Sequence, residues 1–380
     1  MSDIKPFQID IAQAELDDLQ RRLMHIRWLE RETPEDWSQG IPLAYVKELC
    51  SYWREQYDWR RCESWLNGLP QFTTEIDGLD FHFLHVRSPN ENALPLVITH
   101  GWPGSIIEFS KVIGPLTDPA SHGGSDDDAF HLVCPTLPGF GFSGKPSEPG
   151  WGVERIGMAW GQLMARLGYD RYVAQGGDWG AAVTCSMGIT ETHHCAGIHT
   201  NMPILSPSEV FTQDLSEYEK DALASAQYYW DWDSGYSKEQ STRPQTIGYG
   251  LVDSPVAQAA WIIEKFWAWT DSDGHPENVL TRDELLDNVM MYWLPSAGAS
   301  SARIYWESFS LIGTPQAPIE MPSGVSMFPN EIFRASRRWV EERFKNLVHY
   351  NVLEKGGHFA AFEQPSTFVD EVRTCFRHMR

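Results

Sequence analysis

The stretch RYVAQGGDWG, residues 171–180, decides the fold of this chain. It begins with an apolar run of the length of a buried strand and ends with three glycines placed around Asp178 and Trp179. Glycines permit the backbone conformations of a very sharp turn, and a helical stretch follows Trp179. We therefore expect a strand, a tight turn that carries Asp178, and a helix. The plainer alternative is that Asp178 only caps this helix.

The segments on both sides of this stretch alternate between strands and helices. Apolar runs predict strands at 94–100, 130–136 and 196–202, and helical periodicity predicts a helix at 154–167. Upstream, an Asp-Gly pair at 77–78 between two β-like runs predicts a hairpin. Strands separated by helices indicate βαβ units, so the sequence predicts an α/β fold with a mostly parallel central sheet flanked by helices.

Two segments interrupt or precede this sheet pattern. The N-terminal region has helical periodicity at 10–29 and again from Pro42, and a Trp- and Tyr-rich region without convincing strands follows Pro203. A helical insertion of this kind predicts a lid over an active site. Strands are expected again at 324–328 and 347–353, followed by a last helix after Pro365. The expected parts are an N-terminal helical segment (1–70), a first part of the core (71–204), a helical lid (205–310) and a second part of the core (311–380).

Composition narrows the classes of function. The 380 residues are 42% hydrophobic and carry a formal net charge of −22, which disfavours a nucleic-acid partner or an anionic membrane surface. The six cysteines are scattered, so we expect reduced thiols, and no ligand spacing suggests a metal. With no signal peptide and no apolar stretch near ~20 residues, a cytoplasmic protein is expected.

The turn at Asp178 has the pattern of a nucleophile elbow, G-x-S-x-G, with Asp in place of Ser. A carboxylate is already ionised at neutral pH, so it can attack a saturated carbon without a base and form an alkyl ester. Water can then hydrolyse this ester at the carboxyl carbon of Asp178. A Ser nucleophile attacks carbonyl carbons instead, and its absence disfavours an esterase. The sequence therefore predicts substitution at carbon followed by ester hydrolysis.

A second motif, HGWPG at 100–104, ends the strand predicted before it. Its position is the one from which α/β hydrolases supply a backbone N–H to an oxyanion, here that of Trp102, and the N–H of Trp179 would supply the other. His100 is expected to support the turn by hydrogen bonding and not to act as a base.

A third motif, GGHF at 356–359, follows the last predicted strand. In the chain order nucleophile, acid, base, this position predicts that His358 activates the water that hydrolyses the ester. The acid that orients His358 should follow the strand at 324–328. We choose Glu331 for this role, with Glu320 as the weaker alternative.

Together these motifs identify a resemblance that covers nearly the whole chain. Seven segments are similar to segments of the microsomal-type epoxide hydrolases: FQIDIAQAELDDLQRRL, HGWPGS, PTLPGFGFSGKP, GGDWG, STRPQTIGYG, RIYWES and GGHFAAFEQP. This family belongs to the α/β-hydrolase superfamily and includes soluble bacterial and fungal members. The resemblance implies an epoxide hydrolase that converts an epoxide and water to a vicinal diol, without a cofactor or a metal. It departs from the mammalian members in having no N-terminal membrane anchor.

The resemblance also implies two lid tyrosines that hydrogen-bond the epoxide oxygen. Tyr305 in RIYWES matches one of them, and Tyr236 matches the other by its distance before STRP. Phenols have a pKa of ~10, so they can stabilise and protonate the developing alkoxide at neutral pH. The expected substrate-binding residues are thus these tyrosines with Trp102 and Trp179. Three other tyrosines compete for these roles: Tyr228, Tyr229 and Tyr292.

Two other functions are compatible with parts of this pattern. A haloalkane dehalogenase shares the Asp chemistry and needs halide-binding donors, one of which Trp179 could supply, whereas Tyr236 and Tyr305 favour an epoxide. A lidded protein that binds a small ligand without turnover is disfavoured by the intact set of Asp178, His358 and an acid. The partner expected is a small-molecule epoxide, and the acidic surface is compatible with a homodimer.

Overall fold

A sheet of nine strands forms the centre of the computed structural model, which describes residues 4–205, 210–312 and 314–380. Its strand order is β1-β2-β3-β5-β4-β6-β7-β8-β9. The first three pairs in this order, β1–β2, β2–β3 and β3–β5, are antiparallel, and the other five pairs are parallel. Because the carboxyl ends of parallel strands meet at one edge, the loops after β4, β6, β8 and β9 gather there. The strands are β1 (Lys5–Pro6), β2 (Gln71–Ile76), β3 (Leu79–Val86), β4 (Leu94–Thr99), β5 (Phe130–Pro135), β6 (Tyr172–Gly176), β7 (Cys195–Thr200), β8 (Ile319–Met327) and β9 (Phe344–Val352).

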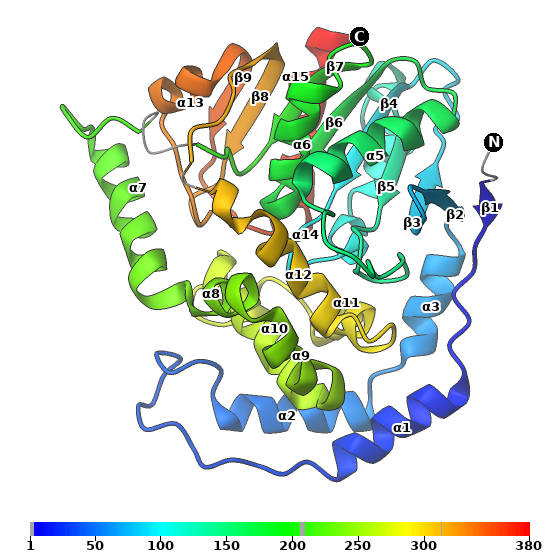
Figure 1. The fold of residues 1–380 in the computed structure, drawn as a ribbon, viewed down its shortest axis with the longest axis vertical. Coiled ribbons are helices and arrows are strands. Elements are labelled where there is room, and N and C mark those ends of the chain that lie inside the picture. The colour runs from blue at the N-terminus through cyan, green and yellow to red at the C-terminus, as the bar shows by residue number, and fades with distance from the viewer. Residues whose placement is uncertain (1–3, 206–209, 313) are drawn as a thin grey trace.

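Helices pack on the sheet through apolar stripes. In α5, Val153, Ile156, Trp160 and Leu163 recur at helical spacing and are buried. In Figure 1, α5 and α6 lie in front of the strands, and α15 packs against β7, β8 and β9. This arrangement confirms the predicted α/β fold with a mostly parallel sheet. The helices of this layer are α4 (Ile113–Thr117), α5 (Val153–Arg166), α6 (Asp178–Thr190), α13 (Arg337–Arg343), α14 (Ala360–Glu363) and α15 (Pro365–Phe376).

The described residues of the insertion between β7 and β8 form helices joined by loops and contain no strand, as the periodicity predicts. Ser216 and Thr281 begin α7 and α11 with capping boxes. Pro244 and Pro255 open α9 and α10, where proline's missing N–H is not needed. Figure 1 shows α8 to α12 gathered below the sheet. These helices are α7 (Glu217–Tyr228), α8 (Gly235–Thr242), α9 (Pro244–Asp253), α10 (Pro255–Trp269), α11 (Arg282–Trp293) and α12 (Gly298–Ser308), with a π-helical turn, η4 (Tyr229–Asp233), between α7 and α8.

The N-terminal region contains three helices, α1 (Gln13–Met24), α2 (Leu43–Glu55) and α3 (Trp59–Asn67). The helical stretch expected after Pro42 is divided because the side chain of Asp58 accepts from the N–H of Arg60 and caps α3. The short strand β1, which pairs with β2 at the sheet edge, was not anticipated by the helical interpretation of this region. No helix among the described residues is both long and apolar enough to cross a membrane.

Asp287 of α11 ties the lid to the N-terminal region. Its carboxylate accepts hydrogen bonds from the hydroxyl of Tyr57 at 2.7 Å and from the guanidinium of Arg61 at 2.7 Å. Asp287 is only 6% exposed, and its removal leaves the half-buried Tyr57 hydroxyl without this partner. This partly buried polar cluster is one of the contacts between the lid and the N-terminal helices, which also include the hydrogen bond from the hydroxyl of Tyr52 to Asp283.

We expect Asp287→Ala to lower the free energy of unfolding by about 1–3 kcal/mol, because it breaks buried hydrogen bonds to a charged group. Chemical denaturation followed by tryptophan fluorescence measures this change. Glu55→Ala is the control, since the ion pair of its exposed carboxylate with Arg54 lies at the surface, and it should leave the unfolding midpoint in place. Equal midpoints for the two variants would contradict the assignment.

Candidate active site

Asp178 lies at the turn between β6 and α6 in the left-handed backbone region, with φ 51°. Such a conformation is strained for a residue with a Cβ and is typical of functional turns. The turn also needs glycines around it: a Cβ on Gly176 would lie 2.1 Å from the carbonyl oxygen of Gly180, and one on Gly180 would lie 2.0 Å from that of Thr99. The sequence GGDWG therefore allows the close approach that puts the carboxylate of Asp178 at the edge of the sheet.

The loop after β4 supplies a hydrogen-bond donor to this carboxylate. The backbone N–H of Trp102 donates to Oδ1 of Asp178 at 2.8 Å. His100 holds this loop, since its Nδ1 lies 2.9 Å from the carbonyl oxygen of Gly101 and its Nε2 accepts from the N–H of Leu137 at 3.2 Å. Burial lowers the pKa of His100 to about 4. His100 is thus a neutral support of the turn, as expected.

His358 lies between two carboxylates. Its Nε2 is 3.3 Å from Oδ2 of Asp178, and its Nδ1 is 2.6 Å from Oε1 of Glu331. Glu331 follows β8 and also accepts from the backbone N–H of Ile332 at 2.7 Å. The alternative acid, Glu320, is exposed on β8. The structure thus brings together the predicted nucleophile, base and acid.

The loop that carries His358 is fixed from two directions. Its backbone N–H donates to the carbonyl oxygen of Trp269 at 2.9 Å. The carboxylate of Glu363 accepts from the N–H of Phe359 at 3.1 Å and from that of Asp271 at 2.8 Å. These contacts join the loop after β9 to the end of α10 in the lid, so the imidazole position depends on both core and lid.

The charge of His358 is set by opposing effects. Burial lowers the pKa of its imidazole, but the nearby carboxylates of Glu331 and Asp178 outweigh burial and raise the pKa well above 6.5. The ring is therefore an imidazolium at neutral pH while Asp178 is ionised. If Asp178 loses its charge, one of the two influences that raise the pKa of His358 is lost.

Two lid tyrosines face Asp178 across a cavity of about 30 Å³. Tyr236 comes from α8 and Tyr305 from α12, and their rings meet edge to face at 5.7 Å. Burial raises the pKa of both phenols well above 10, so both are hydrogen-bond donors at neutral pH. The hydroxyl of Tyr305 has no hydrogen-bond partner among the described residues. It is therefore available to a ligand oxygen in this cavity.

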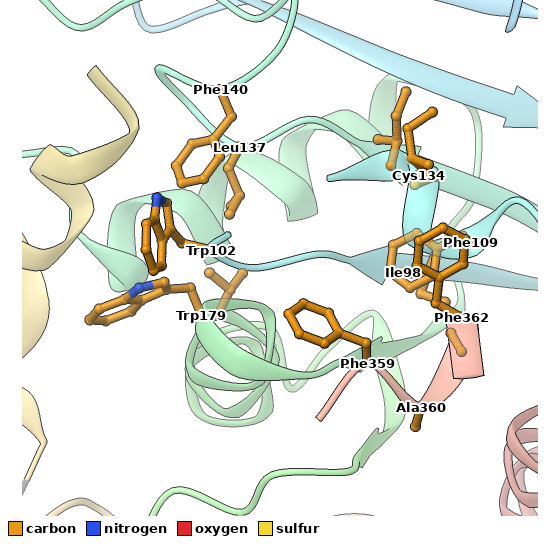
Figure 2. Packing of buried hydrophobic residues seen from close by; sticks show 14 of the residues in the cluster. Ile98, Trp102, Phe109, Cys134, Leu137, Phe140, Trp179, Phe359, Ala360 and Phe362 are labelled. Carbon is orange, nitrogen blue, oxygen red and sulfur yellow. The ribbon is translucent and has the colours of Figure 1, made fainter. Parts of the chain in front are cut away.

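The two tryptophans predicted to flank the site pack around these tyrosines. The indole of Trp102 stacks on Tyr236 at 5.0 Å, and that of Trp179 meets Tyr305 edge to face at 4.8 Å. Figure 2 shows Trp102 and Trp179 among the buried residues of this region, with Phe140 and Leu137 beyond Trp102. The indoles hold the two phenol rings in place.

The competing tyrosines have other positions. Tyr228 is 62% exposed, and Tyr292 donates to the carbonyl oxygen of Gly104 at 2.6 Å. Tyr229, in the π-helical turn, does line the cavity, and its hydroxyl lies 3.1 Å from that of Tyr236. The sequence identified Tyr229 only as a competitor and offered no signal that it would contact Tyr236.

Comparison with known proteins places this architecture in a family. Residues 4–109 match the family described as the epoxide hydrolase N terminus, and residues 95–241 match the alpha/beta hydrolase fold. The chain is 55% identical over 377 residues to a candidate epoxide hydrolase of Stigmatella aurantiaca, which covers 99% of this chain and 86% of that protein. It is 35% identical over 398 residues to epoxide hydrolase 1 of Oryctolagus cuniculus, which covers 97% and 88% of the two chains.

A solved structure agrees with this placement. The solved structure of Aspergillus niger epoxide hydrolase superimposes with a TM-score of 0.90 at 32% identity, and the match covers 100% of this chain and 97% of that one. The fold and site thus define a hydrolase of the α/β-hydrolase fold with a carboxylate at the nucleophile position. More specifically, the chain belongs to the epoxide hydrolase family.

We predict that Glu331→Gln shifts the titration of His358 to lower pH, because it removes a charge that raises this pKa. Histidine ¹⁵N NMR measures the midpoint, and the buried His100 is the internal control that should not move. The raised pKa also makes stability depend on pH. Because the pKa of His358 is higher in the folded protein than the unfolded value of 6.5, its protonation contributes its full stabilisation of the wild-type fold below pH 6.5. This stabilisation is lost as pH rises toward the folded pKa. An unchanged His358 midpoint would contradict the pairing.

Proposed function

We propose that this enzyme hydrolyses small-molecule epoxides to vicinal diols through a covalent ester on Asp178. One arrangement carries the proposal: an attacking carboxylate and two phenol donors line one cavity, and a His–Glu pair contacts the same carboxylate. The other wall residues of this cavity are mostly apolar and include Met202, Ile204 and Phe333. These walls favour an epoxide with apolar substituents. Homodimer formation and a cytoplasmic location stay predictions.

In the first step, the epoxide oxygen accepts hydrogen bonds from Tyr236 and Tyr305. A carboxylate oxygen of Asp178 attacks one ring carbon, and the carbon–oxygen bond of the ring breaks. The oxygen that leaves carries the developing negative charge, which the two phenols stabilise and protonate. This step consumes the charge of Asp178 and leaves a neutral alkyl ester.

In the second step, the ester is hydrolysed. Loss of the Asp178 charge removes one of the two carboxylates that raise the pKa of His358, so the imidazolium can release its proton and act as a base. The released proton restores the phenol that protonated the epoxide oxygen. Water attacks the carboxyl carbon of Asp178 and passes a proton to His358, whose ring Glu331 orients. The tetrahedral oxyanion forms on the oxygen that accepts from the N–H of Trp102, with the N–H of Trp179 as the second proposed donor. The alkyl oxygen takes the proton from His358 as its bond to the carboxyl carbon breaks, and the diol leaves. The proton that stays on the carboxyl group of Asp178 then passes to His358, which restores the carboxylate and the imidazolium.

Replacement of the base should separate the two steps. We expect His358→Gln to form the ester but to hydrolyse it at least a hundredfold more slowly, so intact-protein mass spectrometry detects an adduct with the mass of the epoxide. Asp178→Ala should form no adduct and give no diol. In wild type, single turnover in H₂¹⁸O should place ¹⁸O in Asp178. Wild-type turnover by Asp178→Ala would refute the ester mechanism.

Removal of either phenol should affect the first step. We expect Tyr305→Phe and Tyr236→Phe each to slow ester formation about a hundredfold, the typical effect of losing one donor to a developing oxyanion. Rapid-quench single-turnover measurements separate this rate from ester hydrolysis. Tyr228→Phe is the matched control, since Tyr228 is exposed, and it should react as the wild type does.

Release of halide from a chloroalkane without diol formation from styrene oxide would favour a dehalogenase instead.

A further inference from the structure

A second cavity contacts Asp178 and shares no other lining residue with the cavity of the two tyrosines. The space within it that a water centre can occupy is about 20 Å³, enough for a single water molecule. Its polar lining includes His358, Glu108, Gln175 and Asn201. The carboxyl group of Asp178 thus lies between the cavity of the two tyrosines and a second space that can hold a water molecule.

Apolar side chains close much of this second cavity. Phe109, Phe359 and Ala360 line it, and Figure 2 labels all three among the buried hydrophobic residues. Walls of this kind cannot hydrogen-bond a water molecule. The orientation of a water molecule in this space must therefore come from the few polar groups that line it.

Glu108 is one of these groups, and the proposed two-step mechanism assigns it no role. It lies on a short 3₁₀-helix, η1 (Ile106–Phe109), directly after the oxyanion loop. A Cβ on Gly104 would lie 1.3 Å from Oε1 of Glu108, so the carboxyl group occupies the space that a side chain at position 104 would take. None of the ion pairs among the described residues includes Glu108. Its carboxyl group is thus placed at the cavity without a cationic partner.

Gln175 provides an independent sign that a donor belongs in this cavity. It is 1% exposed, and its Oε1 has no hydrogen-bond partner among the described residues. Its Nε2 donates to Oδ1 of Asn201 at 3.2 Å, so the amide is already oriented with its oxygen free. A buried acceptor without a partner is costly, and a water molecule in the cavity it lines can satisfy it.

We infer that Glu108 is a positioning residue that holds the hydrolytic water between itself and His358, on the side of Asp178 opposite the epoxide. This inference rests on the proposed ester mechanism. One hydrogen of the water points toward the carboxyl oxygen of Glu108 and the unpartnered Oε1 of Gln175, which share it, and the other points to Nε2 of His358. The water oxygen bonds to the carboxyl carbon of Asp178 while its proton passes to His358. The bond from that carbon to the alkyl oxygen then breaks, and the alkyl oxygen takes the proton back from His358. Glu108 neither gains nor loses a proton in this step.

The protonation state of Glu108 agrees with this role. Burial raises the pKa of its carboxyl group to about 8, with a smaller opposing effect of His358 and a raising effect of Asp178. The other titratable groups whose interaction with Glu108 is resolved are Cys134 and Tyr292, and burial raises the pKa of both, so both are uncharged. A neutral carboxyl at pH 7 accepts from water through its carbonyl oxygen. It adds no negative charge beside the developing oxyanion.

The test measures ester formation and ester hydrolysis separately by rapid-quench single turnover. Glu108→Ala should slow hydrolysis at least tenfold and change ester formation less than threefold, so the ester accumulates. Glu108→Gln keeps a carbonyl acceptor in the same place and should restore hydrolysis to within threefold of wild type at pH 7. Gly104→Ala leaves Glu108 in the chain but displaces its carboxyl, and should resemble Glu108→Ala.

The pH profile supplies a readout that a merely structural role would not move. Because burial raises the pKa of the Glu108 carboxyl group, the hydrolysis rate constant of the wild type should show an inflection above neutral pH that Glu108→Gln lacks. Hydrolysis within twofold of wild type in Glu108→Ala, or an equal loss in both steps, would overturn the inference. If the wild type forms no ester on Asp178, the proposed mechanism itself fails. If the ester forms and Glu108→Ala hydrolyses it normally, only the role of Glu108 fails.

Discussion

The site depends on the pairing of a protonated His358 with two carboxylates, those of Asp178 and Glu331. His358 and Glu331 are almost inaccessible, and the imidazole nitrogens lie 3.3 Å from Asp178 and 2.6 Å from Glu331. Burial makes an unpaired charge costly, so two carboxylates at this depth need a counter-charge. The imidazolium supplies it as long as Asp178 is ionised. Under the proposed mechanism, the esterification of Asp178 cancels one carboxylate and frees the imidazole to act as a base, so the chemistry itself switches the role of His358.

This arrangement requires the core, the lid and the loops to meet at one edge of the sheet. Asp178 follows β6, Trp102 follows β4, and Glu331 and His358 follow β8 and β9. Parallel strands bring these loops together because their carboxyl ends share an edge. The lid adds Tyr236 and also fixes the His358 loop through the carbonyl of Trp269. The positions of nucleophile, base and phenols are therefore coupled through backbone contacts.

Division of the site into two compartments follows from the strained turn. With φ at 51°, Asp178 projects its carboxyl group between the tyrosine cavity and the cavity that Glu108 lines. Attack on an epoxide uses one side of this group, and attack by water on the same carbon can use the other. Apolar walls on the epoxide side and polar groups on the other suit the reactant proposed for each. A Ser at this turn would place no such planar group between them.

The sequence by itself determined the features that depend on local structure. Glycines around Asp178 indicate a sharp turn that only glycine allows. Short apolar runs predict the strands, and helical periodicity predicts the helices and the helical lid. The order of Asp178, Glu331 and His358 along the chain follows from the same pattern. Tertiary structure decided what depends on residues far apart. Glu331, not Glu320, meets His358 because only the former lies past the end of β8, at the carboxyl edge of the sheet. Tyr229 and Tyr228 are adjacent, yet only Tyr229 reaches the cavity. No sequence motif pointed to Glu108. Its carboxyl group reaches the cavity beside Asp178 because η1 packs against Gly104, which has no side chain to block it. Local patterns specify a backbone conformation, whereas the distance between side chains on separate elements is set only when those elements pack.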